Sequence, residues 1–167
     1  MKGAIGNALI LNIVITFMII FFSLLIGSMA YSKAYKTKNY LINLIDKYDS
    51  KKEGFDYFMF RGSPQADEWD DEVNHYLGKI GYVMNPYNAS TCPDKSNYKY
   101  TFERGNENGY DYCVYVRFDV DTSDNNEVIK EKYNYMVLVY MKFDFPIIGN
   151  FIKIPITGET KSYTILR

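Results

Sequence analysis

The pattern of apolar and polar residues divides the chain into a short apolar part and a longer polar part. Residues 8–26 read ALILNIVITFMIIFFSLLI and contain no charged side chain. A helix needs about 20 mostly apolar residues, at 1.5 Å each, to cross the hydrocarbon core of a bilayer. The pattern therefore predicts a transmembrane helix near the start of the chain.

A cleaved signal peptide is the alternative interpretation of this segment. Such a peptide has an apolar region of about 7–15 residues followed by small residues at the cut. The stretch Gly27-Ser28-Met29-Ala30 offers the small residues. The apolar run is longer than that, and the helical pattern continues past it without a break, so we predict a retained helix.

Beyond residue 26 the helical period continues, but the pattern becomes amphipathic. Apolar residues recur at steps of three and four, and the lysines fall largely on other faces. The apolar positions are Ala30, Ala34, Leu41, Ile45 and Tyr48. We predict one helix from about residue 4 to residue 48, close to 70 Å long at 1.5 Å per residue.

This helix sets the domain organisation that we expect. Residues 1–53 form a helical stem, with a membrane part at about 4–30 and an amphipathic part at about 31–49. Residues 54–167 form a globular α+β domain outside the cell.

A second, shorter helix is predicted to start at Ser63 and Pro64. Serine caps helix N-termini well, and proline is tolerated at the first helical position. Gly78 and Gly81 mark its end. Its apolar stripe consists of Ala66, Trp69, Val73, Tyr76, Leu77 and Ile80.

Four later segments have the composition and alternation of β-strands: residues 98–103, 110–121, 133–145 and 151–160. Asn108-Gly109 is a hairpin turn signal between the first two. The third is apolar on both faces near its middle, which is typical of a central strand, and Pro155 marks the fourth as an edge strand. The predicted fold is α+β: a long N-terminal transmembrane and amphipathic helix packed on a four-stranded antiparallel sheet, with one further short helix.

The chain has two cysteines, Cys92 and Cys113. A metal site usually needs four ligands, so one disulfide is the better interpretation in a membrane-tethered domain. Such a bond closes a loop of about 20 residues and contributes about 3 kcal/mol in the chain-entropy model. Alternation places Cys113 on the less apolar face of its strand, so the bond would hold a polar loop across the outer face of the sheet.

Candidate catalytic chemistry is sparse. The one histidine, His75, lies in the second helix, and it would form a dyad with Cys113 only if that thiol were free. The sequence contains no G-x-S-x-G, H-E-x-x-H, Walker or G-x-G-x-x-G pattern, and we predict no enzyme, no catalytic residue and no cofactor.

Two acidic groups are candidates for cation sites. Asp119, Asp121 and Asp124 carry oxygen ligands suited to Ca²⁺, but their spacing does not match an EF-hand loop. The other group is explained better as the solvated start of the second helix, where acids favour the helix dipole. Its members are Asp67, Glu68, Asp70, Asp71 and Glu72. We predict no metal site.

The charged residues bear on whether the protein binds nucleic acid and on its orientation in the membrane. Lys and Arg total 19 and Asp and Glu total 20, so there is no basic excess for nucleic acid. Lys33, Lys36 and Lys38 follow the apolar run and only Lys2 precedes it, which by the positive-inside rule places the C-terminal domain inside. The expected disulfide and the short N-terminal segment favour the opposite arrangement. We predict a single-pass protein of the cell membrane with its C-terminal domain outside.

Two segments carry a resemblance to a known family. These are GSMAYSKAYKTKNYLINLIDKY in the stem and VLVYMKFDFPIIGNFIKIPITGETKS near the end of the chain. The layout resembles a type IV pilin or pseudopilin, and these segments resemble TadE-like minor pilins of Gram-positive bacteria. The resemblance implies a structural subunit of a Tad-type pilus or a related secretion or adhesion assembly. Its partners would be other pilin-like subunits, the membrane and the pilus assembly machinery.

The resemblance also assigns residues in the stem. Processing would follow Gly3 or Gly6, and the fifth residue of the mature helix would then be Ala8 or Leu11. Members of the family carry a glutamate at that position, which pairs with the neighbouring subunit's amino terminus; here the first glutamate is Glu53. The residues predicted to mediate stem assembly are Asn7, Asn12, Ala30, Ala34, Leu41 and Ile45. The rival hypothesis is a monomeric membrane-anchored binding or adhesion module at the cell surface.

Overall fold

A computed structural model of the protein describes residues 2–49, 64–80, 92–98, 100–105, 112–122, 128–142 and 153–165. It contains helix α1 (Lys2–Asp49), helix α2 (Pro64–Lys79) and a short 3-10 turn, η1 (Ser96–Tyr98). The strands are β1 (Tyr100–Gly105), β2 (Tyr112–Thr122), β3 (Val128–Lys142), β4 (Lys153–Glu159) and β5 (Tyr163–Ile165). The predicted α+β class is confirmed, with the long helix, the shorter second helix and the antiparallel sheet in the predicted order.

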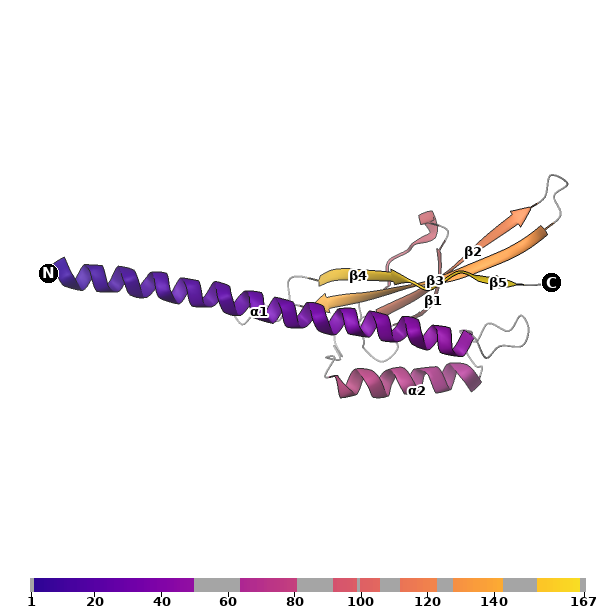
Figure 1. The fold of residues 1–167 in the computed structure, drawn as a ribbon, viewed down its shortest axis with the longest axis horizontal. Coiled ribbons are helices and arrows are strands. Elements are labelled where there is room, and N and C mark those ends of the chain that lie inside the picture. The colour runs from indigo at the N-terminus through magenta and orange to yellow at the C-terminus, as the bar shows by residue number, and fades with distance from the viewer. Residues whose placement is uncertain are drawn as a thin grey trace.

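Helix α1 dominates the shape of the molecule. Figure 1 shows its first half extending alone from a head, which consists of the sheet, α2 and the second half of α1. The predicted helix limits are nearly right, because α1 begins two residues before residue 4 and ends one residue after residue 48. It is continuous because no proline interrupts it and because apolar, helix-compatible side chains fill its first half.

The sheet has the strand order β1-β2-β3-β4, and all neighbouring pairs are antiparallel. The prediction that the third strand is central is confirmed, since β3 pairs with β2 on one side and with β4 on the other. The edge position of β4 is also confirmed. Its Pro155 lies opposite Tyr140, and a residue without an N–H is tolerated at such an edge.

A fifth strand, β5, was not expected from the sequence. It pairs with β3 beyond the end of β4, so β4 and β5 together form one edge. Between Tyr133↔Tyr163 and Met136↔Glu159, the edge has three residues where β3 has two, which makes a β-bulge. Thr160 fills the bulge: its amide donates to the Tyr135 carbonyl at 2.9 Å, and its hydroxyl accepts from the Tyr135 amide at 3.0 Å.

The main core lies between the inner face of the sheet and the two helices. Strand alternation sends Tyr112, Val114 and Val116 of β2 into this core, on the face opposite Cys113. Helix α1 supplies its own stripe, and the helical spacing of three and four keeps that stripe on one side. The buried α1 residues of this core are Ala34, Leu41, Leu44, Ile45 and Tyr48.

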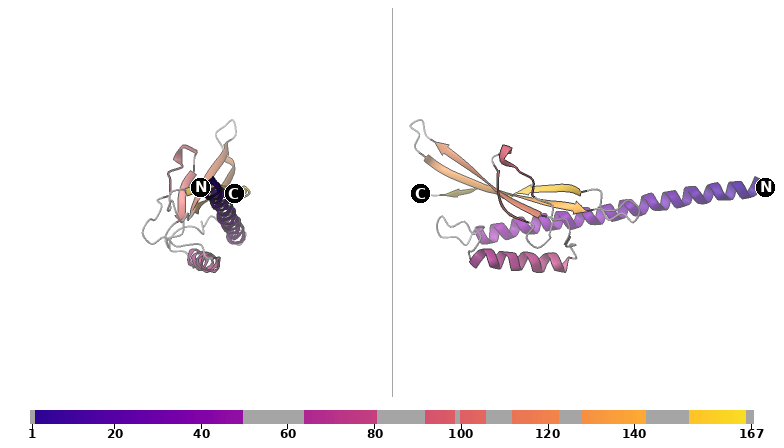
Figure 2. Two further views of the ribbon diagram at one scale, coloured as in Figure 1. Left: turned by 90° about the vertical axis from the view of Figure 1, so that its left-hand side faces the viewer. Right: turned by 180° about the vertical axis from the view of Figure 1, so that it is seen from behind.

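Helix α2 runs antiparallel to the second half of α1 (Figures 1 and 2). Its predicted apolar stripe is largely confirmed: Trp69, Val73 and Leu77 are buried, and Tyr76 and Ile80 are partly buried. The Trp69 ring meets Tyr112 of β2 edge to face, with ring centroids 6.0 Å apart. The predicted turn at Asn108-Gly109 and the predicted cap Ser63 lie outside the described residues.

Strand β4 packs closely against α1 at Gly158. A Cβ built there would lie 2.8 Å from Lys38 Cδ and 2.9 Å from Ile42 Cδ1. Only a hydrogen fits at this position without moving the two side chains.

We expect Gly158→Val to lower the free energy of unfolding by about 1 kcal/mol, because the ends of Lys38 and Ile42 must move aside and strand propensity offsets part of that cost. The matched control is Gly78→Ala in α2, where an added Cβ meets nothing within 4 Å. That change should raise the free energy of unfolding by about 0.5–1 kcal/mol through helix propensity. Urea unfolding followed by the fluorescence of the one tryptophan, Trp69, measures both. Equal stability of Gly158→Val and wild type would contradict the packing at this contact.

Candidate functional site: the exposed stem and its junction with the head

The first half of α1 exposes apolar side chains on every side. Phe17 is 66% exposed, Leu24 is 69% exposed and Met29 is 68% exposed, and no side chain described from residue 9 to residue 29 is buried. A helix that is apolar all around its circumference suits a lipid or helix-packed environment and is unfavourable in water. Helix α1 is long and apolar enough to cross a membrane.

The polar groups inside this apolar half are satisfied mostly within the helix. The Thr16 hydroxyl donates to the Asn12 carbonyl at 2.8 Å, and the Ser23 hydroxyl donates to the Ile19 carbonyl at 2.6 Å. Bonds to the carbonyl four residues earlier remove the cost of placing a hydroxyl in lipid. The Asn12 side chain is exposed on the stem surface.

The structure corrects part of the predicted stem-assembly set. Ala34, Leu41 and Ile45 are at most 1% exposed, because they pack against the protein's own sheet. These three side chains belong to the core of the head and are not available to a neighbouring subunit in this fold. Their burial agrees with the predicted packing of the helix on the sheet, which leaves this stripe no surface for a neighbouring stem.

The remaining members of that set lie closer to the N-terminus. Ala30 is half-buried at the edge of the core, and Asn12 is exposed on the stem. Gly3, Gly6 and Asn7 lie in the first two turns of α1, where only the backbone is described.

An aromatic and basic segment of α1 joins the stem to the head. Tyr31 and Tyr35 stack on the exposed face with ring centroids 6.1 Å apart. Lys38 places its ammonium group 4.3 Å from the centroid of the Tyr35 ring, a cation–π distance. Tyrosine and lysine in this order after an apolar helix are typical of the boundary between a membrane and water.

Helices α1 and α2 are fastened by a cluster around Glu72. Its carboxylate accepts from Lys47 Nζ at 2.7 and 2.9 Å and from the Tyr48 hydroxyl at 3.2 Å. One turn away, the Tyr40 and Tyr76 rings stack with centroids 3.6 Å apart. The hydrogen bond from Lys47 holds the pKa of Glu72 below its ordinary value of 4.5. The sequence placed Glu72 in a solvated helix start and gave no signal of this long-range pairing.

We expect the free energy of unfolding of the head to fall at acidic pH, in part because Glu72 becomes protonated. Because the folded-state pKa is depressed, the stabilisation is present above the ordinary value of 4.5 and is lost as pH falls through the lower folded-state value. Glu72→Gln should cost about 0.5 kcal/mol at pH 7, since the pair is partly exposed, and should remove this part of the pH dependence. Urea midpoints at neutral and acidic pH check it. Parallel pH curves for the variant and wild type would contradict it.

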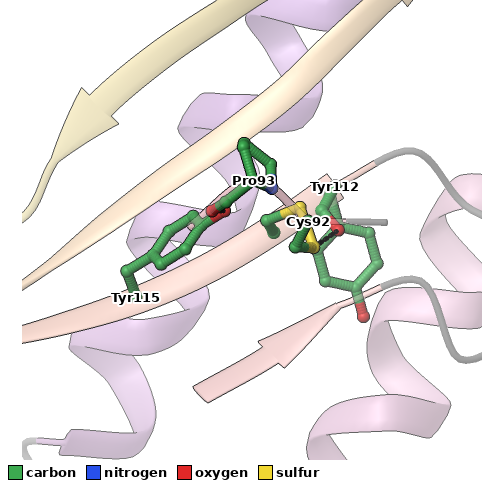
Figure 3. The surroundings of a disulfide bond; sticks show 5 residues. Cys92, Pro93, Tyr112 and Tyr115 are labelled. Atoms are coloured by element: carbon green, nitrogen blue, oxygen red, sulfur yellow. Dashed lines mark hydrogen bonds between the residues drawn. A yellow bond between two sulfur atoms is a disulfide. The ribbon is translucent and has the colours of Figure 1, made fainter. Parts of the chain in front are cut away.

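The predicted disulfide between Cys92 and Cys113 is confirmed, with the two Cα atoms 5.8 Å apart. Figure 3 shows it beside Pro93, whose carbonyl accepts from the Tyr115 hydroxyl at 2.7 Å. As predicted, Cys113 lies on the face opposite the helical core, together with Tyr115, and the bond fixes the segment before β1 over that face. Burial, with the nearby Tyr140 and Asp94, raises the pKa of Tyr115 to about 12.

A polar network on the outer face extends from this second core. The Tyr100 hydroxyl donates to Glu159 Oε1 at 2.8 Å, and the buried Asn134 amide donates to Glu159 Oε2 at 3.3 Å. Arg117 lies over the Tyr100 ring, with its guanidinium carbon 5.3 Å from the centroid. These residues come from four strands, so only the register brings them together.

The residues considered for a catalytic dyad or a cation site do not come together in one site among the described residues. Cys113 is bonded to Cys92 and has no thiol for a dyad, and His75 is exposed on α2. Asp119 accepts from Arg117 Nε at 3.1 Å. The Asp121 side chain and Asp124 lie outside the described residues. Within the part of the chain that the structure describes, no three His, Cys, Asp or Glu side chains are grouped to hold a metal ion.

Comparisons of the chain with protein-family models, with curated proteins and with solved structures find no match.

Proposed function

We propose that the protein is a pilin-like structural subunit of a Tad-type pilus or a related secretion or adhesion assembly. One observation carries the proposal: a single unbroken helix exposes apolar side chains over residues 9–29 and packs into the core of the head in its second half. A simple tether needs no rigid continuation into the head. A continuous helix fixes the orientation of the head relative to its stem. An ordered assembly requires such a fixed orientation.

The physical basis of assembly is the exposed half of α1. In the membrane its apolar surface faces lipid, and in a filament the same surface faces the stems of neighbouring subunits. Helix association in lipid gains from close packing and from polar side chains that bond between helices. Asn12 is such a side chain, and it is exposed within the apolar half. In this proposal the head lies outside the cell, and the assembly machinery extracts the stem from the membrane.

The rival function is a monomeric, membrane-anchored binding or adhesion module. One observation favours it: α1 contains no glutamate, so the acid that pairs with a neighbouring amino terminus in the pilins is missing. The two functions differ in whether stems contact one another.

Cysteine cross-linking in the membrane separates the two functions. The native cysteines are bonded to each other, so a cysteine placed at residue 13, 14, 15 or 16 is the one free thiol in each variant. Four consecutive positions sample the whole circumference of one helical turn. Because each chain then carries one reactive thiol, a subunit of an assembly should give a cross-linked dimer from at least one position. Monomers at all four positions would reject assembly through the stem and favour the anchored module.

A second substitution tests Asn12 directly. In the cysteine variant that gives the cross-linked dimer, Asn12→Leu should weaken association about fivefold, because a hydrogen bond between helices in lipid contributes about 1 kcal/mol. Asn43→Leu is the matched control, since Asn43 is exposed on the head part of the same helix. Intact-mass analysis of the membrane-extracted chain tests processing: loss of the first three or six residues supports cleavage after Gly3 or Gly6.

A further inference from the structure

The end of the head from which α1 emerges is formed by elements that carry lysine there. Helix α2 ends at Lys79, β3 ends at Lys142 and β4 begins at Lys153, all toward the exposed half of α1 (Figures 1 and 2). Lys142 and Lys153 are register partners. We define the basic collar as Lys33, Lys36 and Lys38 of α1 with Lys79, Lys142 and Lys153.

Contacts between the elements fix this arrangement. Tyr40 of α1 stacks on Tyr76 of α2, three residues before the last residue of α2. Gly158 of β4 lies against Lys38 and Ile42 of α1, and β4 starts five residues earlier, toward the stem. The lysines of four elements are therefore gathered at one level of the molecule.

Three described side chains of the collar are available to a partner, whereas Lys38 is half-buried beside Tyr35. Lys33, Lys36 and Lys79 are exposed. Next to them on α1, Tyr31 is 53% exposed and Tyr35 is 44% exposed. The apolar stem begins immediately on the other side, with Met29.

Charge is distributed unequally along the head. The segments that reach the collar contain no Asp or Glu: residues 2–45 of α1, 73–79 of α2, 133–142 of β3 and 153–158 of β4. At the opposite end lie Asp46 and the exposed acids Asp67, Glu68 and Asp71 of the start of α2. Strand β1 also runs toward the stem and carries Glu103 beside Arg104, and β3 carries Lys130 and Lys132 at the far end. Among the described elements, lysine nevertheless predominates next to the stem and acidic residues predominate at the far end.

We propose that the basic collar seats the head on a membrane surface that contains anionic phospholipids. With residues 9–29 in the hydrocarbon core, Lys33 lies about 6 Å farther along the helix, at the depth of the phosphate groups. Lysine ammonium groups bind these phosphates, and Tyr31 and Tyr35 occupy the interface with their hydroxyls toward water. The acidic residues lie at the far end of the head, more than a Debye length from this surface, and do not offset the attraction. The inference requires the membrane span and does not require filament assembly.

Lysine acetylation of the full-length protein in vesicles tests the proposal. Vesicles of phosphatidylcholine alone are compared with vesicles that also contain phosphatidylglycerol, and labelling at each lysine is quantified by mass spectrometry. Lys33, Lys36 and Lys79 should be labelled about fivefold more slowly in the anionic vesicles, the ratio expected for a lysine held at an anionic surface. Lys161, exposed on the loop after β4, is the internal control and should react equally in both. High salt should reduce the protection.

A double variant shows whether the lysines act together. Lys33→Gln with Lys36→Gln should remove most of the protection at Lys79, which lies on a different element. The matched variant, Lys95→Gln with Lys161→Gln, removes the same amount of charge at positions away from the collar. Lys79 should remain protected from acetylation in this variant. Equal labelling of the collar in both kinds of vesicle overturns the proposal. Slower acetylation of the collar in neutral vesicles, increasing with the number of protein molecules per vesicle, would also overturn the proposal. It would mean that the collar binds the acidic end of a second copy of the protein. Failure to enter either vesicle would overturn the membrane span itself.

Discussion

Replacing Leu41 by alanine is expected to lower the free energy of unfolding of the head by about 3 kcal/mol. Leu41 is completely buried between α1 and the sheet, and its removal leaves a cavity that the rigid helix cannot close by shifting. The prediction is measured by urea unfolding of the detergent-solubilised full chain, with Trp69 fluorescence as the signal. Trp69 is a suitable reporter because it is the one tryptophan and is fully buried in the same core.

The control for this prediction is Asn43→Ala, two residues away on the exposed face of the same helix. It should change the free energy of unfolding by less than about 0.5 kcal/mol. The comparison tests the reassignment of the amphipathic stripe from assembly to the core. If Leu41→Ala left the monomer as stable as wild type and only weakened association between copies, the stripe would be an intermolecular surface and the reassignment would be wrong.

Loss of the Cys92–Cys113 disulfide should have an effect of similar size. The bond joins residues 21 apart, and removing it is expected to cost about 3 kcal/mol, chiefly because the unfolded chain regains conformational freedom. The variant is Cys92→Ala with Cys113→Ala, which leaves no buried polar atom at the fully buried Cys113 position. Its urea midpoint should fall well below that of the oxidised wild type.

Reduction provides an independent check on this effect. A thiol reductant should lower the stability of the wild type toward that of the double variant and should leave the variant unchanged. Tyr115→Phe is a further comparison, since it removes only the hydrogen bond to the Pro93 carbonyl and should cost about 1 kcal/mol. A wild type that is insensitive to reduction would mean that the segment before β1 is held by its side-chain contacts and not by the disulfide.

Several features of the fold could be predicted because they are encoded in neighbouring residues. The length of α1, the stripe that contains Leu41 and Ile45, and the two faces of β2 follow from periods of 3.6 and 2 along the chain. The edge position of β4 follows from one residue, Pro155, which lacks an N–H. The disulfide followed from having only two cysteines, since the choice of partner then needs no tertiary information.

Features that depend on residues far apart in the sequence were missed. The hydroxyl of Tyr163 donates to Asp46, 117 residues away, and nothing near either residue signals the contact. Strand β5 is three residues long, too short for a periodic pattern, and is defined by its pairing with β3. The partner of Glu72 was missed because an acid near a helix start has a sufficient local explanation.

The sequence by itself determined an apolar helix long enough for a membrane, its amphipathic continuation and the alternating strands, because each depends on local composition and period. Only the tertiary structure decided what covers each surface. It placed Ala34, Leu41 and Ile45 under the protein's own sheet, left the first half of α1 exposed, and gathered lysines of four elements beside it. These outcomes depend on strand register and on how the elements pack, and both are set by the free energy of the whole folded chain.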